Sequence, residues 1–342
     1  MFSWWLFPIV FGLALGLTAA LRRYALARSM IDIPNGRSSH TVPTPRGGGI
    51  SIVVGFLIAL AWLWSTHLIN NATFIATAGS GFLVAVIGFM DDHGHIAARW
   101  RLVGHFLAAG WVLVWIGGFA PIQIFGASVD LKLVGNILAL LYLVWMLNLY
   151  NFMDGIDGLA SIEALCVCIG AGVLYWINGH GSLVWPPVLL AAAVLGFLFW
   201  NFPPAKIFMG DAGSGFLGIS LGALSLQAAW IDPGFLWMWL ILLGVFIVDA
   251  TFTLVRRLMQ GEKVYEAHRS HAYQYAARRY ARHLPVTLSA AAINVVWLFP
   301  IAYSVSVLGL NGMVGVVLAY APLVLLAIAF DAGKTEVSSP ER

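Results

Sequence analysis

The segment from residue 133 to residue 158 reads LVGNILALLYLVWMLNLYNFMDGIDG and joins an apolar run to a polar end. Residues 133–149 are almost entirely apolar, which is typical of a helix that crosses a bilayer core of roughly 30 Å. The residues that follow carry amides and carboxylates, which are unfavourable in lipid and usually functional there. The segment therefore predicts a membrane helix that delivers a polar cluster to one membrane surface.

The rest of the chain repeats the apolar pattern. Of its 342 residues, 61% are hydrophobic and only 10% are charged, and the mean hydropathy is +0.87. A soluble domain carries about 25% charged residues, so an ordinary soluble protein is excluded. About eleven apolar runs lie at 4–21, 48–65, 74–90, 102–119, 133–149, 161–178, 186–201, 214–231, 235–255, 286–307 and 313–330. The sequence predicts an all-α, polytopic integral membrane protein in which residues 1–342 form a single domain.

Lysine and arginine are distributed unequally between the loops on the two sides. With the N-terminus outside, one set of loops holds Arg22, Arg23, Arg28, Arg37, Arg46, Arg99, Arg101, Lys206, the group from Arg256 to Arg282, Lys334 and Arg342. The opposite set holds only Lys132. Because short cytoplasmic loops retain positive charge, we predict a periplasmic N-terminus, a cytoplasmic C-terminus and a cytoplasmic loop at about 256–285. The basic balance is thus a topology signal, and no nucleic-acid partner is expected.

Carboxylates gather on the predicted cytoplasmic side. Asp91 and Asp92 close the third run, Asp154 and Asp157 follow the fifth, and Asp211 follows the seventh. Three separate loops therefore bring acids to one membrane surface. Such a placement is typical of a functional site, because ionisable groups in an apolar chain are rare without a role.

The polar residues Asn148, Asn151, Asp154 and Asp157 recur at intervals of three, the spacing that lines one side of a helical turn. Amides and carboxylates suit a hard divalent cation, and Mg²⁺ typically binds through one or two protein carboxylates plus substrate phosphates. The alternative interpretation is a capped helix end with Asp-Gly turns.

Residues 201–215, NFPPAKIFMGDAGSG, join Lys206 to Asp211 and a small-residue turn that opens the next run. Helix N-termini with glycine turns bind phosphate through free N–H groups. Since Asp211 would repel a phosphate, the pair of features indicates a cation between them, with Lys206 neutralising the remaining charge. A tight interhelical loop with an N-cap is the alternative.

The polar loop at 265–274, YEAHRSHAYQ, places His268 and His271 on one face if it is helical, with Arg269 between them. No third ligand stands at a zinc-like spacing, so the imidazoles are expected to donate hydrogen bonds to phosphate. Contact with lipid headgroups is the alternative.

Two further features have both a functional and a purely structural interpretation. Residues 37–49, RSSHTVPTPRGGG, include Arg46 and could cradle an anionic headgroup, although a flexible positive-inside loop explains them nearly as well. Asp249, inside the ninth run, either serves the site or bonds to a neighbouring helix.

These motifs, in this order on a chain of about eleven helices, resemble the polyprenyl-phosphate N-acetylhexosamine-1-phosphate transferases of glycosyltransferase family 4. The form HRSHAYQ at residues 268–274 is closer to the O-antigen-initiating subgroup than to the peptidoglycan branch, where adjacent histidines are usual. The resemblance therefore disfavours a muramoyl-pentapeptide substrate.

The resemblance implies a Mg²⁺-dependent enzyme, with Mn²⁺ as an alternative metal, at the cytoplasmic face of a bacterial inner membrane. It would transfer sugar-1-phosphate from a UDP-N-acetyl sugar of the GlcNAc, QuiNAc or FucNAc type to undecaprenyl phosphate. UMP would be released, and O-antigen or another cell-envelope polysaccharide would be started. Membrane lipid surrounds the chain, and a homodimer is left open.

The resemblance also implies residue roles. The catalytic candidates are Asp91, Asp92, His268 and His271, of which Asp91 or Asp92 is expected to orient or deprotonate the lipid phosphate. The metal candidates are Asp211, Asp154 and Asp157. The substrate-binding candidates are Asn148, Asn151, Asp154, Asp157, Lys206, Arg46 and Arg269.

Two functions from other classes compete with this hypothesis. A secondary transporter of an anionic or phosphorylated solute expects polar residues at the membrane midplane and paired broken helices in two related halves. A scaffold for a glycan-assembly complex leaves the aspartates at the membrane edge unexplained.

Overall fold

The computed structural model describes residues 4–34, 39–94, 96–262 and 268–334. Its helices are α1 (Leu6–Ala27), α2 (Ile50–Ser65), α3 (Asn71–His93), α4 (Ala98–Ile116), α5 (Lys132–Met153), α6 (Leu159–Ile177), α7 (Gly181–Asn201), α8 (Asp211–Ala229), α9 (Pro233–Leu242), α10 (Gly244–Met259), α11 (Ala272–Tyr280), α12 (His283–Ile293), the π-helix η1 (Asn294–Leu298), α13 (Phe299–Ser306) and α14 (Gly312–Ala329). Strands β1 (Ile31–Asp32) and β2 (Thr44–Pro45) pair antiparallel, as do β3 (Ile122–Ile124) and β4 (Ala127–Val129). Of the predicted basic residues, Arg37, Lys263 and Arg342 lie outside the described part, as do residues 265–267 of the histidine loop.

All eleven predicted runs are helical, and the predicted all-α, polytopic membrane fold is confirmed. In the described residues, eight helical spans are long and apolar enough to cross a membrane, and the bent pair α9–α10 makes a ninth. The other two runs form α2, a shorter apolar helix, and α4. The number of eleven crossings therefore stays a prediction. The run predicted from residue 186 starts five residues earlier, because α7 begins at Gly181 and takes Pro186 and Pro187 into its second turn.

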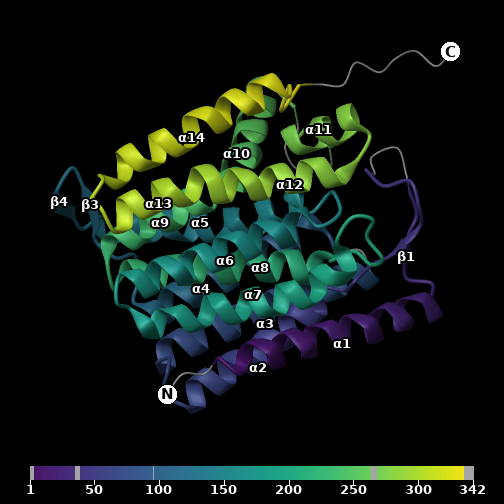
Figure 1. Ribbon diagram of the computed structural model, residues 1–342, viewed down its shortest axis with the longest axis horizontal. Coiled ribbons are helices and arrows are strands. Elements are labelled where there is room, and N and C mark those ends of the chain that lie inside the picture. Colours follow the sequence, from purple (N-terminus) through teal and green to yellow (C-terminus); the bar gives the residue numbers. More distant parts are fainter. Residues whose placement is uncertain (1–3, 35–38, 95, 263–267, 335–342) are drawn as a thin grey trace.

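Helix α8 lies at the centre of the helix stack (Figure 1) and is almost wholly buried. It packs against α3 and α5, and also contacts α2. Glycines permit this close approach. A Cβ on Gly88 of α3 would lie 2.5 Å from the Ala212 nitrogen, and one on Gly213 would lie 2.6 Å from Gly49 Cα. Small residues at such contacts let membrane helices meet backbone to backbone, so the start of α8 is held tightly in place.

The helices share two ends, which Figure 1 separates clearly. At one end, here called the acid end, α3, α5 and α7 finish, α4, α6 and α8 begin, and the β1–β2 pair and α11 lie nearby. The β3–β4 hairpin lies at the opposite end. Asp91, Asp92, Asp154, Asp157 and Asp211 all belong to the acid end, as the sequence predicts.

The span formed by α9 and α10 is broken, with 70° between its two parts. It is the single strongly bent pair in the part of the chain that the structure describes. A transporter built on inverted repeats expects such breaks in corresponding positions of two halves. The arrangement therefore does not favour the transporter hypothesis.

Candidate active site

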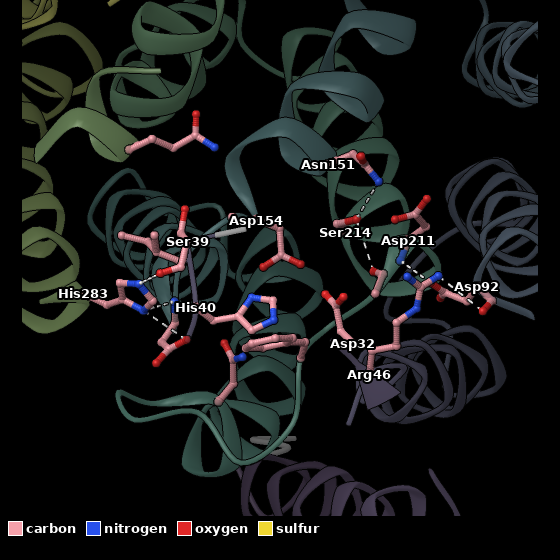
Figure 2. Close-up of a pocket in the computed structure, with 17 residues that line it drawn as sticks. Asp32, Ser39, His40, Arg46, Asp92, Asn151, Asp154, Asp211, Ser214 and His283 are labelled. Atoms are coloured by element: carbon pink, nitrogen blue, oxygen red, sulfur yellow. Dashed lines mark hydrogen bonds and ion pairs between the residues drawn. The ribbon is translucent and has the colours of Figure 1, made fainter. Parts of the chain in front are cut away.

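A cavity of about 220 Å³ lies at the acid end. Its polar lining comes from β1, the segment before α2, the ends of α3, α5 and α7, the α5–α6 loop, the start of α8, and helices α11 and α12. The charged and polar side chains in this lining include Asp32, Ser39, His40, Arg46, Asp92, Asn151, Asp154, Asp157, Asn201, Asp211, Ser214, Gln274 and His283. Figure 2 shows Asp154 in the middle, between the His40–His283 side and the Arg46–Asp92–Asp211 side.

Asp154 is, with Asp32, a carboxylate of this lining that remains available to a ligand. It is the C-cap residue of α5, so the helix end carries it to the membrane surface. No hydrogen-bond donor or cation among the described residues contacts its side chain. Burial, followed by repulsion from Asp211, Asp92 and Asp157, raises the pKa of Asp154 well above its usual value. The same concentration of negative charge would attract a cation.

Asp157 is already paired. Its Oδ1 lies 3.2 Å from His283 Nδ1, and its Oδ2 accepts a hydrogen bond from the Ala205 N–H at 3.0 Å. Its carbonyl accepts from the Thr287 hydroxyl at 2.8 Å. Asp157 thus joins the start of α6 to the α7–α8 loop and to α12, while one edge of it lines the cavity.

Asp92 caps the start of α8 from another helix. Its carboxylate accepts the backbone N–H groups of Asp211 and Ala212, at 3.2 and 3.4 Å, and pairs with Arg46 Nη2 at 2.9 Å. Gly210, with φ of +79°, makes the turn that aims these amides at Asp92. The expectation that free N–H groups at this helix start bind phosphate is therefore wrong for these two amides, because a carboxylate occupies them.

Arg101 links two of the predicted aspartates. Its guanidinium pairs with Asp91 and lies 3.2 Å from Asp211 Oδ2. Asp91 also accepts the Ile96 N–H at 2.8 Å, and it does not line the cavity. Asp211 does line it, so Arg101 joins a cavity carboxylate to a buried one behind it.

Three predicted substrate-binding residues do not line this cavity. Lys206 is exposed and its ammonium lies over the Trp200 ring, 5.5 Å from the centroid. Asn148 donates to the Val144 carbonyl of its own helix at 2.7 Å. Arg269 lies in the loop before α11. The side chains that could bind substrate in the cavity from the predicted set are Arg46, Asn151, Asp154 and Asp157.

His268 and His271 lie together, with ring centroids 4.9 Å apart, but not on a shared helical face. Helix α11 begins at Ala272 and His271 is its N-cap in an extended conformation, so the two histidines are not helical and the condition for a shared helical face is not met. Neither ring lines the cavity, whereas Gln274 in the first turn of α11 does. The His271 ring packs beside Asp249 of α10 and beside Phe152 instead.

Several lining or linking residues were not predicted as site residues. In the sequence, Arg101 was used only to predict the membrane topology. An arginine just before an apolar run can also indicate a buried ion pair. Asp32 and His283 line the cavity, and Gln274 reaches it from α11. Gln274 ends the HRSHAYQ motif, whereas the neighbourhoods of Asp32 and His283 carry no motif, and only the packing of β1 and α12 brings these two to this end.

The predicted ligands Asp211, Asp154 and Asp157 line one cavity without forming a ready-made cage. In the described chain, no three side chains of His, Cys, Asp or Glu gather closely enough to hold a metal ion. Asp157 faces His283 and Asp211 faces Arg101, which draws the carboxylates apart. Mg²⁺ usually takes only one or two carboxylates and completes its shell with phosphate and water. Asp154 and Asp211 fit that kind of site.

Comparison with known proteins identifies the family of this chain. The model of the family described as glycosyl transferase family 4 matches residues 74–229. A decaprenyl-phosphate N-acetylglucosaminephosphotransferase of Mycobacterium leprae is 32% identical over 75% of this chain and 75% of its own length. The chain belongs to glycosyl transferase family 4. A phospho-N-acetylmuramoyl-pentapeptide-transferase of Moorella thermoacetica is 34% identical over 61% of this chain and 69% of its own length. A probable undecaprenyl-phosphate N-acetylglucosaminyl 1-phosphate transferase of Bacillus subtilis is 29% identical over 75% and 72%.

The family 4 match covers α3 to α8. It therefore contains the end of α3 with Asp92, the end of α5 with Asp154 and the start of α8 with Asp211. Helices α10 and α11, which carry Asp249 and Gln274, lie beyond the matched residues.

Proposed function

We propose that this family 4 protein is a sugar-1-phosphate transferase of cell-envelope synthesis. It transfers N-acetylhexosamine-1-phosphate from a UDP-N-acetyl sugar of the GlcNAc, QuiNAc or FucNAc type to undecaprenyl phosphate and releases UMP. The product would start O-antigen or another surface polysaccharide at the cytoplasmic face of the bacterial inner membrane. The observation that carries the proposal is one cavity at the acid end that joins Asp154, Asp211 and Arg46.

The proposed reaction is a phosphoryl substitution. An oxygen of the lipid phosphate forms a bond to the β-phosphorus of the donor, and the bond from that phosphorus to the bridging oxygen breaks, so that UMP leaves. Asp154 and Asp211 would hold Mg²⁺, or Mn²⁺, which supplies charge neutralisation for the diphosphate. Because two polyanions must meet, positioning and charge compensation dominate such a reaction.

Arg46 is the protein cation best placed for this task. Its guanidinium lines the cavity and is held by Asp92 at 2.9 Å, and 36% of its side chain is exposed. Arg101 pairs with Asp211 from behind. We assign the binding of a phosphate group to Arg46 and the orientation of Asp211 to Arg101.

Asp92 is better suited to positioning than to proton transfer. Only 1% of its side chain is exposed, and Arg46 and two backbone amides already occupy its oxygens. A phosphomonoester has its second pKa near about 6 and is mostly dianionic at neutral pH, so a dedicated base is not required. We therefore propose that Asp92 holds the start of α8 and Arg46 in place, and that Asp91 holds Arg101.

His268 would act as a neutral hydrogen-bond donor. Burial, followed by the nearby charges of His271 and Arg257, lowers the pKa of His268 to about 3. The Ser270 N–H points at His268 Nδ1 at 3.4 Å, and the Ser270 hydroxyl lies 3.0 Å from the same atom. With Nδ1 as acceptor, the proton is assigned to Nε2. We propose that this histidine loop meets the sugar or diphosphate of the donor.

The test is a donor panel with purified protein in detergent. UDP-GlcNAc, UDP-QuiNAc and UDP-FucNAc are each supplied with undecaprenyl phosphate and Mg²⁺, and released UMP and the lipid product are quantified. We expect UMP release with at least one donor, in equal amount to the lipid-linked sugar, and loss of both on chelation of the metal. At the Mg²⁺ concentration that is half-saturating for wild type, the variant Asp154→Asn should lose most of its activity, whereas Asp232→Asn at the opposite end should keep it.

The proposal is wrong if no donor yields UMP in the presence of the lipid. It is also wrong if UMP appears at the same rate without undecaprenyl phosphate, because a hydrolase would then explain the cavity. If transfer proceeds without a metal, only the assignment of Asp154 and Asp211 as metal ligands is overturned.

A further inference from the structure

Asp249 is a buried carboxylate that the proposed reaction leaves without a role. It lies in α10, is 7% exposed, and does not line the cavity of the acid end. Its Oδ1 accepts the Ala272 N–H at 2.9 Å and its Oδ2 accepts the Tyr273 N–H at 3.0 Å. The Thr253 hydroxyl, one turn along α10, donates to Oδ1 at 3.2 Å. Asp249 thus caps the start of α11 from another helix.

The capped helix reaches the candidate active site at its first turn. The Tyr273 hydroxyl donates to the Phe152 carbonyl at 2.8 Å, just before Asp154, and Gln274 lines the cavity. Gly155 leaves room for this contact, because a Cβ there would lie 2.1 Å from the Tyr273 oxygen, closer than atoms can approach. The end of α5 therefore supports the first turn of α11, and Gln274 in that same turn lines the cavity.

The histidine loop depends on the same cap. His271 is the N-cap residue of α11, and its N–H donates to Gln274 Oε1 at 3.2 Å. Its Nδ1 lies 3.4 Å from Asp249 Oδ1. A first turn without the carboxylate would leave two buried amides unpaired, which helix starts do not tolerate away from water.

We propose that Asp249 is a positioning residue of the transferase. By capping α11 it holds Gln274 at the cavity and His271 beside it. This inference rests on the proposed function for its effect on activity, although the cap itself is independent of that function.

The experiment compares Asp249→Ala and Asp249→Asn with Asp232→Ala in the full-length protein. Asp232 is a matched control, because it is an exposed aspartate that caps α9 through the Gly234 N–H at 2.7 Å and lies away from the acid end. Hydrogen exchange followed by mass spectrometry reports the peptide over 268–280. Kinetics of UMP release report kcat/KM for the donor and the Mg²⁺ concentration at half-maximal rate.

In Asp249→Ala the 268–280 peptide should exchange about tenfold faster, the factor expected for loss of one helix cap. The donor kcat/KM should fall by about the same factor, since Gln274 and His271 lose their positions. The half-saturating Mg²⁺ concentration should not change, because Asp154 and Asp211 are untouched. Asp249→Asn keeps one carbonyl acceptor and should lie between wild type and Asp249→Ala, and it serves as the folded variant if the alanine change prevents folding. Asp232→Ala should alter neither α11 exchange nor kcat/KM.

The positioning role is refuted if both Asp249 variants exchange in residues 268–280 as wild type does. A rise in exchange spread over the whole chain, or a matching loss of Mg²⁺ affinity, would also refute it, since either would indicate general destabilisation. If wild-type protein releases no UMP with any donor, the transferase proposal fails, whereas the exchange result still decides whether Asp249 caps α11.

Discussion

Gly88→Ala is the substitution that most directly tests whether contact between α3 and α8 positions the site. A Cβ at Gly88 would lie 2.5 Å from the Ala212 nitrogen and 2.6 Å from both Ala212 Cα and the Asp211 carbonyl carbon. Ordinary contact begins at 3.4 Å. All of these obstacles are backbone atoms, so no side chain can rotate away, and α8 must move by about 1 Å relative to α3.

That movement would separate groups that the site needs together. The Asp211 and Ala212 amides are 3.2 and 3.4 Å from Asp92, so both hydrogen bonds would stretch beyond their useful range. Overpacking of a tight contact costs typically about 1–3 kcal/mol. A displacement of about 1 Å at catalytic groups can cost about 100-fold in rate. We therefore expect kcat to fall about 100-fold, with a lower thermal unfolding temperature.

The assay is UMP release with the best donor of the panel, together with thermal unfolding in the same detergent. Gly110→Ala in α4 is the matched control, because a Cβ there has nothing within 4 Å. Helix propensity alone would stabilise either variant by about 1 kcal/mol, so the control should unfold at or above the wild-type temperature and keep its kcat. Wild-type kcat in Gly88→Ala would refute the claim that this helix contact sets the site.

Three other changes test separate parts of the site. Asp154→Asn should raise the Mg²⁺ concentration at half-maximal rate by at least about tenfold, as measured by metal titration, and an unchanged titration would exclude it as a ligand. Lys206→Ala should keep kcat and donor KM within about twofold, since its side chain is exposed over Trp200, whereas a large rise in donor KM would restore its predicted role in substrate binding. The pKa of His268 is lowered to about 3, below its usual value near about 6.5, so the unfolded chain binds the proton more readily. Its contribution to stability is then complete above about pH 6.5 and declines toward pH 3. Between pH 7 and pH 5 the unfolding temperature of wild type should fall more than that of His268→Gln, and parallel curves would contradict the lowered pKa.

The fold class was predictable because lipid restricts the choice of structure. A run such as 133–149 can cross a bilayer only if its backbone satisfies its own hydrogen bonds, and here that produces α5. The same argument places successive loops on alternate sides. Asp92, Asp154 and Asp211 follow the third, fifth and seventh runs, so they lie at the same end. The cavity that these three aspartates line follows from the placement of their loops on the same side.

The partners of each charged side chain were not predictable in the same way. Asp92 pairs with the start of α8 only because Gly88 lets α3 approach it, and Asp249 meets α11 only through the packing of α10. Lys206 was predicted to face phosphate, yet the aromatic ring of Trp200 lies under its ammonium. Local motifs identify which residues are polar, whereas the helix packing decides which of them remain available.

Carboxylates at the acid end therefore have two different roles, the capping of helix starts and the binding of a ligand. Helices that begin at a membrane boundary expose N–H groups without a partner in the preceding turn, and Asp92 and Asp249 satisfy those of α8 and α11 from neighbouring helices. The oxygens of such a carboxylate already accept hydrogen bonds from N–H groups, so they have little capacity to bind a ligand. Asp154 has no such donor among the described residues, and the repulsion it feels from its neighbours would be relieved by a cation. An aspartate in an apolar chain is thus a ligand candidate only after the helix starts around it have been checked, and by that criterion Asp154 ranks ahead of Asp91 and Asp92.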